Sequence, residues 1–179
     1  MIDEKALYKQ LQNDSTKEAA FTLLIREYQE PLYWQIRRMV VVHDDADDVL
    51  QNTFIKAWSA IDSFRGESRL QTWLFRIAIN ESLNFLSKKK QTLSLDQNEG
   101  IGANMLSSDS YFDGDQLQRQ FQKAIGTLPD KQRLVFNLKY FDEMKYEDMS
   151  DLLGTSIGAL KASYHHAVRK ISAFFENNG

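Results

Sequence analysis

Two helical patterns that follow each other between Asp44 and Lys90 constrain the fold of this chain more than any other feature. In the first pattern, apolar and small residues recur at intervals of three and four, the spacing of one buried face of an α-helix. The residues of this face are Ala46, Val49, Leu50, Thr53, Phe54, Ala57, Trp58 and Ile61. Asp44 and Asp45 mark the start, because carboxylates there can accept hydrogen bonds from the free amides of a first helical turn. We therefore expect a helix that packs one face against a core.

The second pattern begins at Ser68, which together with Gln71 has the spacing of a capping box. Its apolar face consists of Leu70, Trp73, Leu74, Ile77, Ala78, Phe85 and Leu86. Its polar side consists of Arg69, Thr72, Arg76, Asn80, Asn84 and Lys88. We therefore predict a second helix with one core face and one cationic, amide-bearing face. Trp58 and Trp73 lie on the apolar faces and are predicted to be core residues.

The apolar residues elsewhere in the chain also keep helical spacing. We expect a weakly amphipathic helix over 5–13 and a longer helical segment over 19–42, which Pro31 either kinks or divides. The helical period returns at Gln116, and Pro129 opens the next helix. No alternating pattern of useful length indicates a β-strand. The sequence therefore predicts an all-α fold.

The C-terminal part has the pattern of a helix-turn-helix motif. A helix over Tyr146–Leu153 is followed by a turn at Gly154–Thr155 and by a helix that Ser156 caps. Gly154 can adopt the left-handed turn conformation, and Leu160 is placed to pack the second helix inward. The predicted inward face is Leu160, Tyr164, Ala167, Val168 and Ile171. The predicted outward residues, which suit hydrogen bonds with base edges or phosphates, are Lys161, Ala162, His165 and His166.

Residues 91–115 differ in composition from the helical parts on either side. They are rich in Ser, Asn, Asp, Gly and Gln, and they hold five acidic residues but no Lys or Arg. This composition is typical of a flexible linker. A chain of 179 residues, 42% of them hydrophobic, suffices for two small domains. We therefore predict two helical domains, 1–90 and 116–179, joined by this linker.

Charge, cysteine content and hydropathy exclude several classes of protein. A net charge of −3 argues against coating nucleic acid by bulk electrostatics, although residues 51–90 hold seven basic and three acidic side chains. The absence of cysteine excludes disulfides and thiolate metal sites. We expect no signal peptide and no membrane span, and hence a cytoplasmic protein. A metal site built from His43 and the acids after it is disfavoured, because adjacent carboxylates on a helix diverge. We predict no metal and no cofactor.

Several of these stretches resemble one known family. Asp45–Phe54, Ala57–Trp58, Phe64–Gly66 and Thr72–Asn80 resemble region 2 of the bacterial extracytoplasmic function (ECF) sigma factors, the promoter-recognition subunits of RNA polymerase. The stretch from Leu128 to Lys161 is similar to region 4 of the same family. The resemblance implies a monomeric protein without catalytic residues that directs core RNA polymerase to promoters.

The resemblance also implies protein partners. Core polymerase would be contacted at the coiled-coil clamp of its largest subunit and at its flap region. The residues implied at the clamp are Asp47, Asp48, Gln51, Asn52 and Ile55. Taken alone, the acidic ones would describe a solvated helix start. Family members are commonly held inactive by an anti-sigma factor, often tethered to the membrane, and we expect such a partner. The linker is either a plain tether or, as in the family, a segment that threads through polymerase and mimics nucleic acid.

Two promoter elements would be read by different domains. The residues implied at the downstream (−10) element are Phe64, Arg65, Arg69, Arg76, Asn80, Asn84 and Lys88. There an aromatic ring could stack on an unstacked base and an amide could read a base edge, the alternative for Phe64 being a loop anchor packed on the core. The residues implied at the upstream (−35) element are Ser156, Gly158, Ala159, Lys161, Ala162, His165, His166 and Arg169. Ser163 and His166 stand where arginine is frequent in the family, which predicts weaker phosphate anchoring and a different upstream sequence.

Two other classes of function remain open from the sequence. A regulator that uses the helix-turn-helix alone, with the N-terminal helical domain as a sensor or interaction domain, predicts tight, specific binding to duplex DNA without polymerase. An enzyme that acts on nucleic acid through the acidic cluster predicts metal-dependent turnover and its loss on Asp47→Ala.

Overall fold

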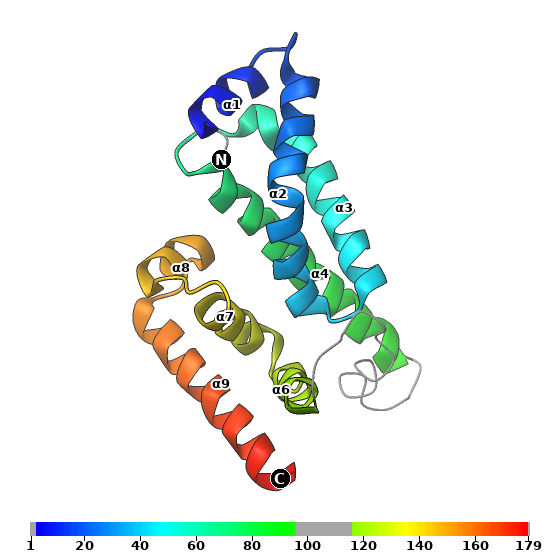
Figure 1. The fold of residues 1–179 in the computed structure, drawn as a ribbon, viewed down its shortest axis with the longest axis vertical. Coiled ribbons are helices and arrows are strands. Elements are labelled where there is room, and N and C mark those ends of the chain that lie inside the picture. Colours follow the sequence, from blue (N-terminus) through cyan, green and yellow to red (C-terminus); the bar gives the residue numbers. More distant parts are fainter. Residues whose placement is uncertain (1–2, 96–115, 179) are drawn as a thin grey trace.

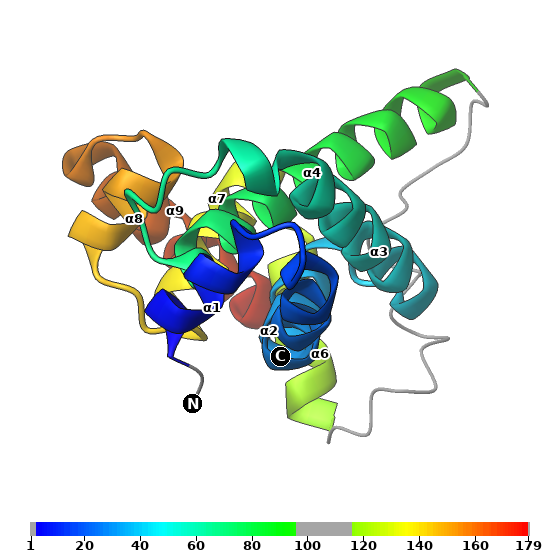
Figure 2. The same cartoon turned by 90° about the horizontal axis from the view of Figure 1, so that it is seen from above.

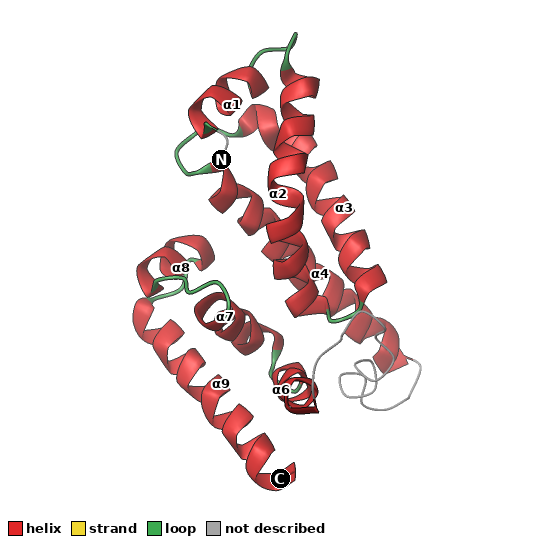
Figure 3. Ribbon diagram, viewed as in Figure 1, coloured by secondary structure: helices red, strands yellow, loops and turns green. Residues whose placement is uncertain are grey.

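All regular structure in the described part of the chain is helical (Figures 1 and 3), as predicted. The computed structural model describes residues 3–95 and 116–178. The first unit consists of α1 (Glu4–Leu11), α2 (Lys17–Val40), α3 (His43–Ala60), the single 3₁₀ turn η1 (Ile61–Ser63) and α4 (Leu70–Leu95). The second unit consists of α6 (Gln116–Gly126), α7 (Asp130–Tyr140), α8 (Tyr146–Leu153) and α9 (Ile157–Asn178). None of the helices in these two ranges is long and apolar enough to cross a membrane.

The core of the first unit lies where α2 packs against α3 and α4. Leu24, Leu32 and Ile36 of α2 and Leu74 of α4 are completely buried there. Burying one such side chain away from water contributes roughly 1.5–3 kcal/mol to the free energy of unfolding. The helix α2 runs through Pro31 without a break, so the chain is not divided there. One long helix therefore serves as the axis of this unit.

Several predicted boundaries shift by a few residues. Val42 is the N-cap of α3, so Asp44 and Asp45 lie inside the first turn instead of marking the start. There their charges still complement the positive end of the helix dipole. The helix α4 begins at Leu70, two residues after Ser68, and extends to Leu95. Residues 91–95 of the predicted linker are therefore helical, and the rest of it lies outside the described residues.

The predicted helix-turn-helix is confirmed in α8, the turn and α9. Gly154 has φ +63°, and the hydroxyl of Ser156 accepts a hydrogen bond from the amide of Ala159 at 3.3 Å. Leu160 is completely buried and packs α9 inward. The prediction for Val168 was wrong, because its side chain is 38% exposed. Trp58, also predicted to be in the core, is 38% exposed and packs edge-to-face on Phe21.

The two units lie against each other. The helix α7 contacts α2, and α8 contacts α4 beside its first turns (Figure 2). Leu134, Val135 and Leu138 of α7 belong to the same apolar cluster as the core of the first unit. The contact therefore has an apolar centre as well as the polar contacts described below.

Replacing Gly154 with alanine is expected to lower the free energy of unfolding by about 1–2 kcal/mol, because a left-handed backbone strains any residue with a Cβ. A Cβ at this position would meet no atom within 4 Å, so steric overlap adds nothing. Gly158 offers a matched control, because its Cβ would also point into open space but its φ is not in the left-handed range. Gly158→Ala should raise the free energy of unfolding by up to about 1 kcal/mol. Urea denaturation checks both, and equal effects of the two substitutions would contradict the argument.

Candidate functional site

A groove between α2 and α3 gathers most of the residues predicted to bind polymerase. Its lining residues are Ile25, Gln29, Asp47, Asp48, Leu50, Gln51 and Phe54. Asp47, Asp48 and Gln51 are exposed at its edge, whereas Leu50 and Phe54 are half-buried. Asn52 and Ile55 do not line the groove but are exposed on the same helix, and Ile55 is 58% exposed. The five predicted residues thus share α3, with acidic groups beside an apolar floor.

His43 connects this acidic edge to α2. Its Nε2 lies 3.3 Å from Oδ2 of Asp47, and its Nδ1 lies 2.7 Å from the hydroxyl of Tyr33. Both ring nitrogens therefore have partners that fix the ring. Among the described residues, no three His, Cys, Asp or Glu side chains come together closely enough to hold a metal ion.

The polar side of α4 forms one exposed stripe. Arg76, Asn80, Asn84 and Lys88 follow each other at intervals of four residues, and all four are exposed. Asn80 and Asn84 also line a hollow between α3 and α4, whose other lining residues are Lys56, Ala60, Ile77, Glu81 and Leu83. This arrangement places amides that can read base edges between cations that can hold phosphates.

The loop between α3 and α4 presents its arginines and hides its aromatic ring. Arg65 and Arg69 are exposed. Phe64 is only 8% exposed, and its ring packs 4.9 Å from that of Trp73 and 5.5 Å from that of Tyr8. The ring of Phe64 therefore leaves little surface in this structure on which a base could stack. Burial removes the apolar ring from water, and the alternative of a loop anchor is the one observed.

The hydroxyl of the buried Tyr28 connects α2 to α1 beside this loop. Tyr28 donates a hydrogen bond to Oε1 of Glu4 at 3.0 Å, and Oε2 of Glu4 lies 3.7 Å from Nε of Arg69. Burial, and next the hydrogen bond with Glu4, raise the pKa of Tyr28 far above its ordinary value of 10.0. The folded chain therefore holds this proton more tightly than the unfolded chain does.

This shift predicts a loss of stability in alkali. Because the folded pKa is the higher one, the contribution of Tyr28 is complete below pH 10.0 and declines as the pH rises above it. The expected slope is up to about 1.4 kcal/mol per pH unit from this one group. Tyr28→Phe should unfold with a shallower dependence on alkaline pH in urea titrations. The same slope in both proteins would contradict the assignment.

Every residue predicted at the upstream element is exposed, on the recognition helix α9 or, for Ser156, directly before its first residue. Ser156, Gly158, Ala159, Lys161, Ala162, His165, His166 and Arg169 are all exposed. The ammonium of Lys161 lies 5.7 Å from the ring centroid of Tyr146 in α8. The structure thus brings this set together along α9 and at Ser156 directly before it, and the opposite face of α9, with Leu160 and Ala167, is buried.

Sequence reasoning missed the polar contacts between the two units. Arg38 of α2 donates from Nη1 to Oδ1 of Asp142 at 2.7 Å, and its guanidinium lies 4.7 Å from the ring centroid of Phe141. Nδ2 of Asn137 donates to the backbone carbonyl of Arg38 at 3.2 Å and lies 3.7 Å from the sulfur of Met39. Burial raises the pKa of Asp142, although Arg38 acts in the opposite direction.

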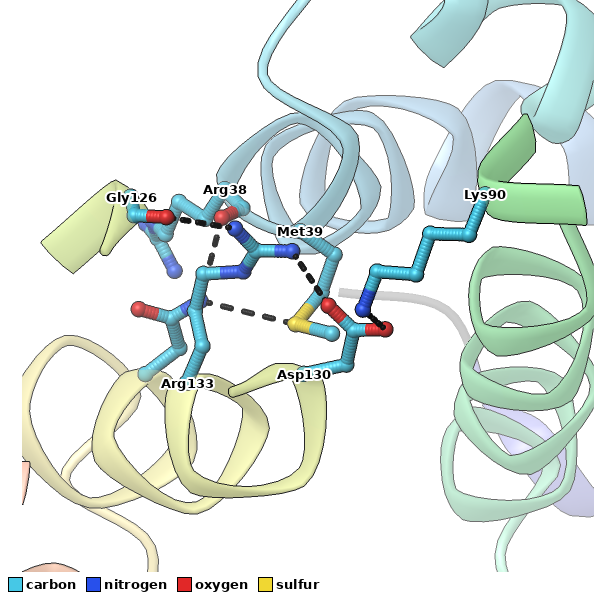
Figure 4. Close-up of polar contacts among 7 residues, drawn as sticks. Arg38, Met39, Lys90, Gly126, Asp130 and Arg133 are labelled. Atoms are coloured by element: carbon cyan, nitrogen blue, oxygen red, sulfur yellow. Dashed lines mark hydrogen bonds and ion pairs between the residues drawn. The ribbon is translucent and has the colours of Figure 1, made fainter. Parts of the chain in front are cut away.

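A second contact is centred on Asp130 (Figure 4). One carboxylate oxygen of Asp130 accepts from Lys90 of α4 at 2.7 Å, and the other accepts from the buried Arg133 at 3.1 Å. Arg133 also donates to the carbonyl of Gly126 at 3.5 Å, and burial lowers its pKa. Arg76, predicted at the downstream element, donates to the carbonyl of Asp151 in α8 at 3.1 Å. The only sign in the sequence of a contact between the two units was the polar residue Asn137 inside an apolar run.

Comparison with known proteins agrees with this geometry. The chain matches Sigma-70 region 2 over residues 24–92 and Sigma-70 region 4 over residues 118–171. It is 30% identical over 176 residues to the ECF RNA polymerase sigma-E factor of Haemophilus influenzae, covering 93% of this chain and 92% of the relative. It is 33% identical over 165 residues to the ECF RNA polymerase sigma factor SigW of Bacillus subtilis, covering 84% and 88%. Among solved structures, it resembles the sigma factor RpoE of Bartonella quintana in complex with the anti-sigma factor NepR. That match has a TM-score of 0.70 and 26% identity, and it covers 87% of this chain and 96% of the other.

The matches to regions 2 and 4 identify the two helical units as those of a DNA-binding transcription initiation factor. The chain belongs to the sigma-70 family, among its ECF sigma factors, which direct RNA polymerase to promoters. This agrees with the resemblance seen in the sequence.

Proposed function

We propose that this sigma factor binds core RNA polymerase through the groove between α2 and α3 and reads promoter DNA with α4 and α9. The observation that carries the proposal is the exposed stripe of Arg76, Asn80, Asn84 and Lys88, because a stand-alone duplex-binding regulator has no use for it. In this proposal residues 1–90 bind polymerase and the downstream element, and residues 116–179 bind the upstream element.

The groove suits a helical partner with basic and apolar side chains. Asp47 and Asp48 would pair with cations at its edge, while Leu50 and Phe54 provide an apolar surface. In the ECF sigma factors this surface docks on the clamp coiled coil of the largest polymerase subunit, and we propose the same partner. Ile55, 58% exposed on the same helix, would become buried in that contact.

Opening of the promoter follows from preferential binding. A protein that binds the single strand more tightly than the duplex shifts the equilibrium toward the open form by that difference in free energy. The arginines of the α3–α4 loop would hold phosphates of the melted strand, and Asn80 and Asn84 would contact its bases in the hollow between α3 and α4. The protein itself carries out no chemical step, so we propose that it is not an enzyme.

The upstream element would be read in the major groove by α9. Lys161 and His165 can donate to base edges or phosphates, and Ala162 can contact a thymine methyl group. Few arginines lie on this surface, so we expect a modest share of the affinity to come from phosphates and the rest to come from polymerase.

An anti-sigma factor is the proposed regulator. The solved structure of the Bartonella quintana relative contains one, NepR, and a similar partner here would compete with polymerase or promoter DNA. We propose that the chain is otherwise a monomer and acts in the cytoplasm, where polymerase and chromosome are found.

Run-off transcription tests the proposal. The purified chain is added to sigma-free core polymerase on fragmented DNA of its source organism, and transcript starts are mapped. Starts that share upstream and downstream elements are expected. Asn80→Ala should weaken selection of the downstream element, and Lys161→Ala should weaken selection of the upstream one. Absence of starts above core alone, together with tight binding to duplex DNA, would favour the stand-alone regulator.

A further inference from the structure

The helix α1 lies on the loop that links α3 to α4, and it falls outside the part of the chain that matches Sigma-70 region 2. The hydroxyl of Tyr8 donates to the backbone carbonyl of Phe64 at 3.1 Å. Its ring meets the ring of Phe64 edge-to-face, with centroids 5.5 Å apart. One side chain of α1 therefore contacts both the backbone and the side chain at the centre of the loop.

The same tyrosine limits the space at Gly66. This glycine has φ +69°, and a Cβ there would lie 3.2 Å from two ring atoms of Tyr8. The loop thus turns directly against the ring in a conformation that favours glycine. Tyr8 therefore restricts the backbone on both sides of Arg65.

Other residues of α1 and its neighbours contact the ends of the loop. Nε2 of Gln12 donates to the carbonyl of Ile61 at 3.4 Å. Nζ of Lys17 donates to both carboxylate oxygens of Asp62, at 2.6 and 2.8 Å. Glu4 pairs with Arg69 at 3.7 Å at the other end. The loop is therefore contacted along its length by the N-terminal part of the chain, with Tyr8 in the middle.

We propose that Tyr8 is a positioning residue for recognition of the downstream element, a role that rests on the proposed function. It holds the loop in the one conformation that presents Arg65 and Arg69 to the melted strand. A loop already ordered in the binding conformation does not lose that conformational freedom on binding. A loop released from Tyr8 samples several conformations, so it binds the strand more weakly and distinguishes its bases less well.

Loss of the contacts of Tyr8 should leave the groove between α2 and α3 unaffected. In Figure 1, α1 lies near the end of α3, whereas the acidic residues of the groove lie near its start. Changes at Tyr8 should therefore alter promoter selection without altering affinity for core polymerase.

The experiment uses the full chain with Tyr8→Phe and Tyr8→Ala, and with Lys9→Ala as an exposed control on the same helix. Each protein is assayed for affinity to core polymerase, for amide hydrogen exchange over residues 61–69, and for run-off transcription from a promoter panel with each downstream base varied. Tyr8→Phe removes only the hydroxyl, and a lost hydrogen bond predicts about a two- to tenfold loss of discrimination among these bases. Tyr8→Ala should lose more of this discrimination and should show faster amide hydrogen exchange in the loop. Both Tyr8 variants and Lys9→Ala should bind core polymerase with the affinity of the unaltered chain.

The outcomes separate this inference from the proposed function. If the unaltered chain gives no promoter-specific starts, both fail. If it gives specific starts and Tyr8→Phe keeps its discrimination and its loop exchange, the role of Tyr8 alone is overturned. Because Tyr8→Phe retains the packed ring, it decides the question even if Tyr8→Ala does not fold.

Discussion

Asp48→Lys should strongly weaken the binding of this sigma factor to core RNA polymerase. Asp48 is exposed at the edge of the groove between α2 and α3, so the substitution should leave the fold intact. It replaces an attractive charge with a repulsive one at an interface, and losses of 2–5 kcal/mol for such pairs predict an affinity lower by on the order of a hundredfold. Titration of a fluorescently labelled chain with core polymerase at fixed ionic strength measures the effect.

Asp44→Lys is the matched control for this prediction. It makes the same charge change on an exposed residue of the same helix, but Asp44 does not line the groove. Its affinity for polymerase should fall far less, while run-off transcription should be lost only for Asp48→Lys. Equal losses for both variants would mean that the net charge of α3, and not the groove, determines binding.

The parts of the fold that depend on local sequence were predictable. The apolar spacing in Tyr146–Leu153 and the glycine after it gave α8 with its observed bounds. Helix ends defined by weaker signals were displaced, because Asp44 and Ser68 can stabilise a first turn without being its cap. Periodicity therefore located the helices but did not fix their ends.

The candidate site was predictable only where it lies on one helix. A spacing of four residues places Arg76, Asn80 and Asn84 on one face of α4, and this holds for any packing of the other helices. Phe64 lies in a loop, where no period separates a buried ring from an exposed one, and its burial depends on Tyr8 from a distant helix. Sequence pattern contains no information about such partners.

The contact between the two units was unpredictable for the same reason and is also incompletely satisfied. Arg38 and Asp142 are 104 positions apart in the chain. At or near this contact, Oδ1 of Asn137, Oδ2 of Asp142 and Nε of Arg133 are buried without a hydrogen-bond partner in the protein. Each buried polar atom left unpaired costs about 1–3 kcal/mol. The free energy gained from the apolar centre of the contact is thus partly offset by these unpaired atoms. We therefore expect the two units to separate when one of the polar contacts between them is lost.

Arg38→Ala should therefore separate the two helical units. The substitution removes the ion pair with Asp142 and the contact with the ring of Phe141, and it leaves a half-buried carboxylate without its counter-charge. Breaking a buried pair costs 3–5 kcal/mol, so about 1–3 kcal/mol is expected at this partly exposed position. Small-angle scattering should report a larger radius of gyration, whereas Arg26→Ala, an exposed arginine of the same helix, should leave it unchanged.

The pH dependence of this opening identifies its cause. Burial raises the pKa of Asp142 above its ordinary value of 3.8, while Arg38 lowers it, so removing Arg38 should raise it further. A carboxyl whose pKa is higher in the closed form binds its proton more tightly there, so closure is favoured below that pKa and weakened as the pH rises through it. Arg38→Ala should accordingly close again on acidification toward pH 3.8, and adding Asp142→Asn should remove this dependence. An open form of Arg38→Ala that does not respond to acid would show that the Phe141 contact, and not the charge of Asp142, holds the two units together.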